Sequence, residues 1–218
     1  MTGIAAIAPY ALPAEAYAGL DRTGWRVDRR RAVLLVHDMQ EYFLRPFRPD
    51  APPMSVVLPN AVRLRQACAE LDVPVVYTAQ PGSMTPEQRG LLDAFWGAGM
   101  SAADEDRRIV DELAPGPNDR VLTKWRYSAF HHTPLLELLR ETGRDQLVVC
   151  GVYAHLGCLI TAVEAFSHGI QPFLVTDAVA DFSGEDHRLA LTYGARACAA
   201  TPATKQVLDD LAGEEGAG

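Results

Sequence analysis

Four polar residues of different chemical types each stand at the end of an apolar, strand-like run. Asp38 follows AVLLVH, Gln80 follows VPVVYTA, Lys124 ends RVLTK, and Tyr153 follows QLVVCGV. A carboxyl group, an amide, an ammonium and a phenol can together transfer a proton and bind an anionic substrate. Because ligands of open α/β sheets bind beyond the carboxyl ends of the strands, we expect these four side chains in one site.

Three further residues lie near these strand ends in the sequence. Arg89 falls in the helical segment after Gln80, and a guanidinium binds a carboxylate through two parallel hydrogen bonds. Trp96 ends that segment and Phe43 follows Asp38, so both are candidate apolar walls. Taken singly, each residue also has a structural explanation, since an aspartate after a strand often caps a turn and most lysines are exposed. The predicted site therefore depends on their convergence.

The segments that must position these residues alternate between strand-like and helix-like patterns. Runs that are apolar on both faces indicate strands covered by helices on each side, as in a parallel sheet. We predict an α/β fold: an open, doubly wound, mostly parallel sheet of about six strands with helices on both faces. The strands that can be located are 32–37, 73–79, 120–124, 146–152 and 171–178, and the expected helices are 60–71, 86–96, 104–113, 134–141, 155–167, 185–199 and 204–211.

The chain divides into one domain and two ends. Residues 1–28 are rich in Pro, Gly and Ala without a period, which predicts an extended arm that wraps its own domain or a partner subunit. Residues 29–211 are expected to form a single α/β domain, and residues 212–218 a disordered tail.

Composition limits the partners and the location that we expect. With 20 Lys+Arg against 28 Asp+Glu, the net charge of −8 argues against nucleic acid or an anionic membrane as a partner. The first residues do not resemble a signal peptide, and no apolar run reaches the roughly 18 residues that a membrane span needs. Four widely spaced cysteines indicate reduced thiols, so a cytoplasmic protein is expected.

The sequence indicates neither a metal nor a cofactor. It contains no glycine-rich phosphate loop, and its histidines do not have the spacing of metal ligands. His155 opens a predicted helix and is expected to be structural. His37 precedes Asp38 in the strand, so alternation places its side chain on the opposite side of the sheet from Asp38.

A family resemblance rests on four long, ordered segments: LLVHDMQEYFLRP, VVYTAQPGSMTPEQRGLLDAFWGAGM, LTKWRYSAFHHTPL and GRDQLVVCGVYAHLGCLITAVEAFSHGIQPFLVTDAVADFS. They resemble isochorismatases, within the isochorismatase-like hydrolase superfamily, over about Arg30 to Leu211. The resemblance implies hydrolysis of the enol-pyruvyl ether of isochorismate or 2-amino-2-deoxyisochorismate. The products would be pyruvate and a dihydro-dihydroxybenzoate or a dihydro-hydroxyanthranilate.

The chain departs from the superfamily's amidases at one position. Those relatives carry an Asp-Lys-Cys triad whose cysteine lies six residues after the glycine of G-V-x-T-x-x-C. Here Gly157 holds that position and Cys158 follows it, and one residue along a helix turns a side chain by about 100°. This departure resembles the isochorismatase branch, in which the Val152–Tyr153 peptide would be cis. A cysteine-dependent amidase using Cys158 and a non-catalytic binding role remain as alternatives.

Within that branch two substrates compete. QPGSMT and EQRGLL are similar to phenazine-pathway enzymes, which act on the 2-amino substrate, whereas GVYAHLGC is also similar to siderophore-pathway enzymes. We favour the amino substrate and keep isochorismate open. The resemblance further implies a homodimer or a higher homo-oligomer, in which the N-terminal arm would be an intersubunit clasp.

The expected mechanism makes Asp38 and Lys124 catalytic. Protonated Asp38 would deliver its proton to the terminal methylene of the enol ether, and water would then add to the resulting cation. The other residues expected to bind substrate are Gln80, Arg89, Tyr153, the Gly157 backbone N–H, Phe43 and Trp96. The Lys124 ammonium lowers the pKa of Asp38, whereas desolvation or substrate carboxylates raise it, and the sequence leaves this balance open. Since the substrate is a dianion, we expect a locally positive pocket.

Overall fold

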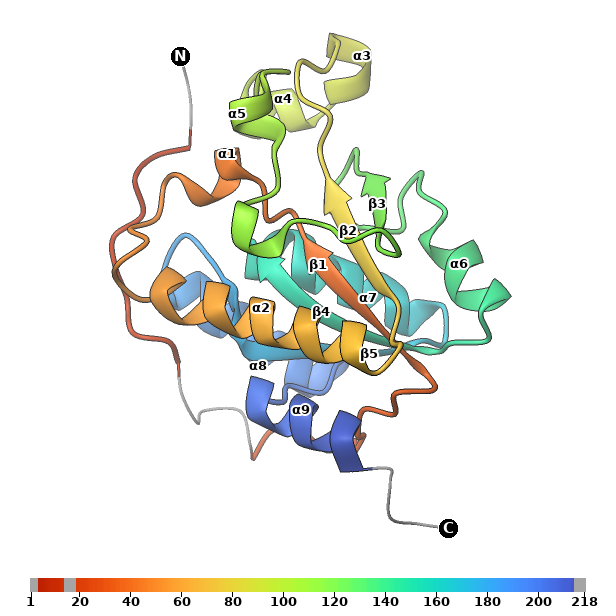
Figure 1. The fold of residues 1–218 in the computed structure, drawn as a ribbon. Helices are drawn as coiled ribbons and strands as arrows, with labels where there is room; N and C mark the ends of the chain where they lie inside the picture. The colour runs from red at the N-terminus through yellow and green to blue at the C-terminus, as the bar shows by residue number, and fades with distance from the viewer. Residues whose placement is uncertain (1–3, 14–18, 214–218) are drawn as a thin grey trace.

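The computed structural model describes residues 4–13 and 19–213 and centres on a five-stranded parallel sheet (Figure 1). Its order is β3-β2-β1-β4-β5, and every pair of neighbouring strands is parallel. The chain winds outward from β1 on one side and from β4 on the other, which confirms the predicted doubly wound fold. The strands are β1 Ala32–His37, β2 Val75–Ala79, β3 Arg120–Thr123, β4 Gln146–Val152 and β5 Gln171–Ala180.

A sixth strand is reduced to a single bridge. Ala200 pairs with Phe173 in parallel, its N–H donates to the Pro172 carbonyl at 3.0 Å, and its carbonyl accepts from Leu174 at 2.9 Å. Pro202 follows and has no N–H with which to continue such a ladder. Among the described residues the sheet therefore has five strands, where the sequence predicted about six.

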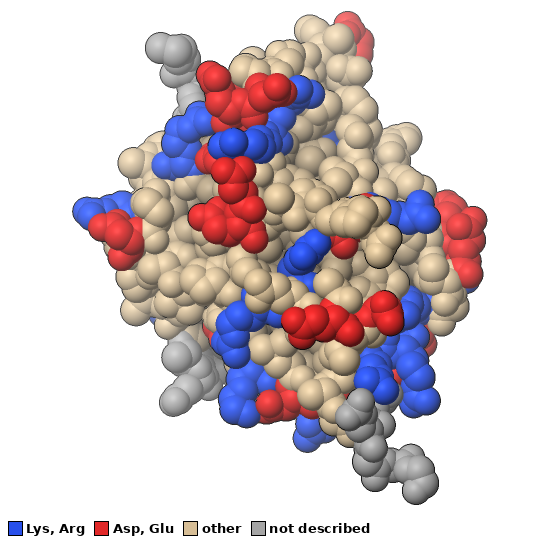
Figure 2. All heavy atoms as spheres, viewed as in Figure 1, with Lys and Arg blue, Asp and Glu red and all other residues tan. Residues whose placement is uncertain are grey.

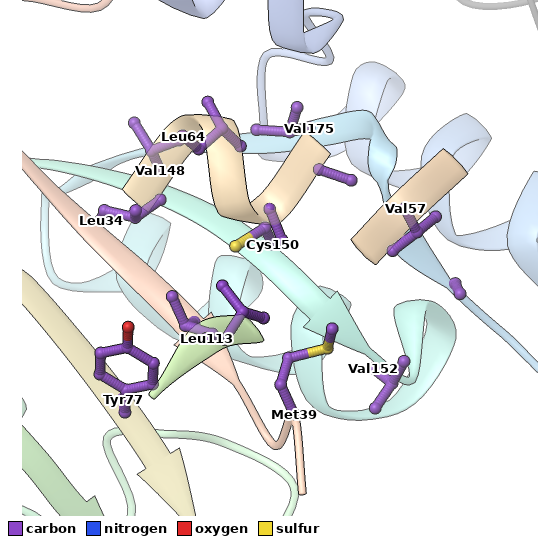
Figure 3. Packing of buried hydrophobic residues seen from close by; sticks show 14 of the residues in the cluster. Leu34, Met39, Val57, Leu64, Tyr77, Leu113, Val148, Cys150, Val152 and Val175 are labelled. Atoms are coloured by element: carbon purple, nitrogen blue, oxygen red, sulfur yellow. The ribbon is translucent and has the colours of Figure 1, made fainter. Parts of the chain in front are cut away.

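Helices cover both faces of the sheet, as predicted. Alternating side chains of β1 divide between two clusters: Leu34 and Val36 belong to one, Val33 and Leu35 to the other. Figure 3 shows Leu34 and its neighbours on β4 packed beneath one long helix. That face is covered by α2 (Met54–Glu70) and α9 (Thr204–Ala212), and the other by α6 (Leu135–Glu141), α7 (Leu159–Ser167) and α8 (Gly184–Ala197).

Short helices gather beyond the carboxyl ends of β1 and β2 (Figure 1). The predicted helix 86–96 is two helices, because Gly90 with φ 52° ends the first of them. The predicted helix 104–113 is also divided, since Arg108 is extended and Ile109 pairs with Gln40. The elements at this edge are α1 (Glu41–Leu44), α3 (Pro86–Arg89), α4 (Leu92–Trp96), α5 (Asp104–Arg107) and the 3-10 helix η1 (Asp111–Leu113).

Two other helices begin differently from their predictions. The helix expected at 60–71 begins at Met54 and continues through Pro59. The helix expected at 155–167 begins with a π-helical turn, η2 (Ala154–Cys158), which leads directly into α7. The wider π turn is a feature often found at functional sites.

The described part of the N-terminal arm lies against its own domain. Ile7 and Val27 are buried, and the backbone N–H groups of Ile7 and Tyr10 donate to the carbonyls of Pro46 and Pro52. At the other end α9 extends through Ala212, one residue beyond the expected domain boundary. The expected tail from residue 214 onward lies outside the described residues.

The surface has mixed charge on the face drawn in Figure 2, where acidic and basic side chains are interspersed without a continuous basic stripe. In the described part of the chain, no helix combines the length and the apolar character of a membrane span.

Candidate active site

One cavity of about 770 Å³ opens at the carboxyl edge of the sheet, beside the switch point between β1 and β4. All eight residues that the sequence selected line it: Asp38, Phe43, Gln80, Arg89, Trp96, Lys124, Tyr153 and Gly157. The convergence on which the prediction depended is therefore present. Other lining residues come from the N-terminal arm, η2 and the loops: Ile4, Ile7, Met100, Tyr127, Leu156 and Phe182.

Asp38 stands directly after β1 in a left-handed turn. Its φ is 50°, a conformation that aspartate tolerates better than most residues. The Thr78 hydroxyl on β2 donates to Asp38 Oδ1 at 2.6 Å and accepts from the Asp38 N–H at 3.1 Å. Only 4% of Asp38 is exposed. The carboxyl group is therefore fixed at the floor of the cavity by its own backbone and by the neighbouring strand.

Lys124 supplies a positive charge at the same floor. Its Nζ lies 2.9 Å from Asp38 Oδ2 and donates to the Arg126 carbonyl at 2.7 Å. Its backbone N–H continues the β2–β3 ladder by donating to Ala79 at 2.9 Å. An ammonium has three N–H donors, so after these two contacts one remains for a ligand.

The contact between Asp38 and Lys124 decides the charge of Asp38. Burial favours the protonated carboxyl, but the Lys124 charge, the neighbouring His37 and the Thr78 hydrogen bond together outweigh burial and lower the pKa of Asp38 below its ordinary value. The balance that the sequence left open thus favours an ionised carboxylate beside an ammonium.

Gln40 holds the strand end that carries Gln80. Its side-chain oxygen accepts from the Gln80 N–H at 2.7 Å, and its nitrogen donates to the Gln80 carbonyl at 3.0 Å and to the Arg107 carbonyl at 2.7 Å. Sequence reasoning missed Gln40 and Thr78. Gln40 lies two residues after Asp38, and Thr78 lies two residues before Gln80. Because residues two apart in a strand point to the same face, this spacing was the signal that could have identified them.

Arg89 ends α3, where Thr85 and Gln88 form a capping box. Its Nε donates to the Gly97 carbonyl at 2.7 Å, and its guanidinium packs so closely on Gly99 that an added Cβ there would lie 2.8 Å from Cζ. Burial lowers the pKa of Arg89, but a guanidinium stays charged in proteins. No hydrogen bond from its two terminal nitrogens is found among the described residues, and both are suited to a carboxylate.

Aromatic rings form one wall of the cavity. Tyr153 stacks on Phe182 with a centroid distance of 4.0 Å, and Trp96 stacks on Phe182 at 5.6 Å. The Tyr153 hydroxyl donates to the Phe43 carbonyl at 2.8 Å, and Trp96 Nε1 donates to the Tyr127 hydroxyl at 2.7 Å. Tyr153 therefore presents a ring to the cavity, whereas the sequence interpretation used its hydroxyl to bind substrate.

His37 lies beside the cavity, contrary to the expectation that it points away. It is buried and lines the cavity next to Asp38, with 3.9 Å between His37 Nδ1 and Asp38 Oδ1. Strand alternation predicted the opposite side, but the positive φ of Asp38 ends the strand geometry on which alternation depends.

Position 157 cannot hold a nucleophilic side chain in this structure. A Cβ added to Gly157 would lie 2.6 Å from His37 Nε2. Cys158 is fully buried and does not line the cavity, and burial raises the pKa of its thiol well above the ordinary value. The Val152–Tyr153 peptide bond is cis, as the resemblance implied.

One group of side chains in the described ranges has the composition of a metal site: His155, Asp181 and Asp186. Asp181 already accepts from the His155 ring at 2.8 Å, from the His155 N–H at 2.6 Å and from the Phe182 N–H at 2.8 Å. Asp186 accepts from Ser183 at the start of α8. These hydrogen bonds join the cluster to the start of η2 and to the start of α8.

The charge of the cavity lining differs from the expectation of a positive pocket. Lys124 and Arg89 are balanced by Asp38 and Asp93. The two cations instead stand at separate points of the lining, where each can meet one carboxylate of a ligand.

The fold and the site define the class of protein: an α/β enzyme with a buried carboxylate–ammonium pair at the switch point of a parallel sheet, suited to acid–base chemistry on an anionic substrate. The family model described as Isochorismatase domain matches residues 32–206. The chain belongs to the isochorismatase family.

Individual relatives agree with this membership. The phenazine biosynthesis protein PhzD1 of Pseudomonas aeruginosa is 57% identical over 209 residues, covering 96% of this chain and 100% of that protein. The isochorismatase of Bacillus subtilis is 50% identical over 208 residues, covering 95% of this chain and 67% of that protein. A cysteine hydrolase from Pseudomonas syringae pv. phaseolicola matches in fold, with a TM-score of 0.79 and 23% identity over 87% of this chain and 96% of that one.

Proposed function

We propose that this enzyme hydrolyses the enol-pyruvyl ether of 2-amino-2-deoxyisochorismate or isochorismate. It releases pyruvate together with a dihydro-hydroxyanthranilate or a dihydro-dihydroxybenzoate. The observation that carries the proposal is the Asp38–Lys124 pair in a cavity whose described lining contains no thiol. A vinyl ether needs a proton donor and water, whereas an amide requires a nucleophile or an activated water.

The reaction begins with proton transfer to carbon. Asp38 gives its proton to the terminal methylene of the enol ether, which becomes the methyl group of pyruvate and leaves an oxocarbenium ion at the ether carbon. Water adds to that carbon and returns a proton to the Asp38 carboxylate. Asp38 gives this proton to the ring oxygen as the bond between that oxygen and the hemiketal carbon breaks, and the ring alcohol leaves. The hemiketal hydroxyl loses its own proton to Asp38, which forms the carbonyl of pyruvate and leaves Asp38 protonated again.

The substrate itself supplies the condition for protonating Asp38. The Lys124 ammonium by itself keeps the pKa of Asp38 low. A substrate carboxylate beside Lys124 offsets that charge, and the bound substrate displaces water from between the apolar walls, so both changes raise the pKa of Asp38. The enzyme therefore takes up a proton as substrate binds.

The remaining lining residues have separate roles in this proposal. Arg89 binds one carboxylate through its terminal nitrogens, Lys124 and the Gly157 backbone N–H bind the other, and Gln80 binds the ether oxygen. Phe43, Trp96 and Tyr153 form the walls that keep bulk water from the cation.

We favour 2-amino-2-deoxyisochorismate as the substrate and a place in phenazine-type biosynthesis. The support is the 57% identity to a phenazine biosynthesis protein along that protein's full length, together with the QPGSMT and EQRGLL motifs. Isochorismate, the substrate class of the siderophore-pathway branch, is the other candidate.

The test supplies each substrate separately and measures pyruvate release, because the ratio of kcat/KM values defines discrimination. We expect release from both, with a higher kcat/KM for the amino substrate. The Cys158→Ala variant is the matched control and keeps full activity. Absence of pyruvate with either substrate, or loss of activity in Cys158→Ala, contradicts the proposal.

We also propose a cytoplasmic location and self-association. Four cysteines that are all buried and free fit a reducing compartment. Light scattering tests the assembly: a dimer or larger species is expected, and a monomer contradicts it.

A further inference from the structure

His37 is the last residue of β1, and its buried ring packs against Gly157 of η2. The mechanism above does not use it. Its Nδ1 lies 2.8 Å from the Val152 carbonyl oxygen. A carbonyl only accepts, so Nδ1 carries the hydrogen of this bond. Burial lowers the pKa of His37 from its ordinary value, so the ring is neutral. Nε2 is buried and forms no well-aligned hydrogen bond among the described residues, although the Tyr127 backbone lies near enough to favour the protonated ring.

The other side of the ring contacts the backbone of Gly157. A Cβ added at Gly157 would lie 2.6 Å from Nε2, 2.9 Å from Nδ1 and closer still to Cε1. The ring cannot easily move aside, since only 1% of His37 is exposed and the Val152 bond fixes its orientation. The pair His37–Gly157 therefore sets how closely η2 approaches the end of β1.

The distance between η2 and the end of β1 determines which backbone groups at the start of η2 face the cavity. Leu156 and Gly157 both line the cavity, within the first turn of a helical segment whose early N–H groups lack intrahelical acceptors. A change in the spacing between β1 and η2 moves these groups relative to Asp38 and Lys124.

We propose that His37 is a positioning residue: its ring, fixed by the Val152 carbonyl, holds the Gly157 backbone at the substrate carboxylate and excludes any side chain at position 157. The inference rests on the proposed function for the identity of that carboxylate. The contact itself does not depend on it.

Two properties of the ring can be separated by substitution. Asparagine places an amide N–H near the position of Nδ1 and retains the hydrogen bond to Val152, whereas phenylalanine fills the space with no donor. We expect His37→Phe to raise the KM for substrate roughly tenfold. The dissociation constant of 3-hydroxyanthranilate, an aromatic carboxylate that resembles the ring product, should rise by a similar factor. His37→Asn restores most of that affinity, and kcat changes less than KM in both variants.

A double-mutant cycle tests the packing. Gly157→Ala is expected to lower the urea midpoint strongly in the wild-type background, because its Cβ meets the His37 ring. In the His37→Ala background the same substitution should lower the urea midpoint by less than half as much, because the ring that meets the new Cβ is absent. Additive effects of the two substitutions, or native affinity in His37→Phe, would overturn the proposal.

Failure of the proposed function and failure of the His37 role give different results. If neither ether substrate yields pyruvate, the proposed function fails, whereas the urea cycle and the 3-hydroxyanthranilate titration still test His37, since neither requires turnover. If the wild type releases pyruvate and the cycle is additive, only the role of His37 fails.

Discussion

Lys124 Nζ lies 2.9 Å from Asp38 Oδ2, and both side chains are almost completely buried where the sheet's carboxyl ends converge. Burial of two charges is costly, and their mutual attraction offsets this cost only while both are present. The pair therefore affects both the stability of the fold and the chemistry of the site. Lys124 compensates the buried carboxylate of Asp38, and it also keeps ionised the group that must carry a proton during catalysis.

Replacement of Asp38 by asparagine removes the proton donor with little change of shape. We expect pyruvate release to fall by about 10²–10⁴-fold, the usual contribution of a positioned acid. Binding of 3-hydroxyanthranilate should persist, because Arg89 and Lys124 remain. Steady-state assays and calorimetry measure the two quantities, and turnover near the wild-type rate would refute the role of Asp38.

Replacement of Lys124 by methionine leaves the Asp38 carboxylate buried without its partner. The expected loss in the free energy of unfolding is about 3–5 kcal/mol, measured by urea denaturation. The double variant Asp38→Asn, Lys124→Met buries neither charge of the pair and should recover part of this loss. A double variant no more stable than Lys124→Met would show that the carboxylate does not cause the instability.

Arg89→Lys tests the carboxylate fork. Lysine keeps the charge but cannot form two parallel bonds, so KM should rise about tenfold or more while kcat changes less. Arg126→Lys is the matched control, since Arg126 donates to the backbone carbonyls of Gln88 and Trp125 and does not line the cavity. Equal KM values for the two variants would remove Arg89 from the binding site.

His187 makes stability depend on pH. Burial lowers its pKa to about 4, so the unfolded chain, with a histidine pKa near 6.5, binds a proton first as the pH falls. The stability that neutral His187 contributes is present above about pH 6.5 and is lost as the pH falls toward about 4. Urea denaturation of the wild type and of His187→Gln should diverge across this window. Parallel pH dependence in the two proteins would contradict the lowered pKa.

The parts of the site that sequence predicted share a physical cause. Each of the four polar residues Asp38, Gln80, Lys124 and Tyr153 follows a strand. Parallel strands bring their carboxyl ends to one edge of the sheet, and this does not depend on the conformation of the loops. Position along the chain was enough to place them together. The ring of Tyr153 and the packing of Arg89 on Gly99 required coordinates, because both depend on contacts between distant segments.

The errors have equally local causes. The side chains of His37 and Asp38 lie close together, and not on opposite sides, because period-two alternation fails at the left-handed backbone of Asp38. The helix expected at 86–96 continued through Gly90, whose positive φ no periodic pattern reveals. Ile4 and Ile7 line the cavity although they lie far from it in sequence, and an arm without periodicity gives no signal of where it packs.

The isotopic composition of the products tests the central claim, protonation of the vinyl ether at its terminal carbon followed by water addition to the resulting cation. The enzyme is supplied with 2-amino-2-deoxyisochorismate in deuterated, ¹⁸O-labelled water, and both products are examined by mass spectrometry. We predict one deuterium in the pyruvate methyl group and no ¹⁸O in the ring hydroxyl, because the ring keeps the ether oxygen. Incorporation of ¹⁸O into the ring hydroxyl, or a pyruvate methyl group without deuterium, would contradict this account.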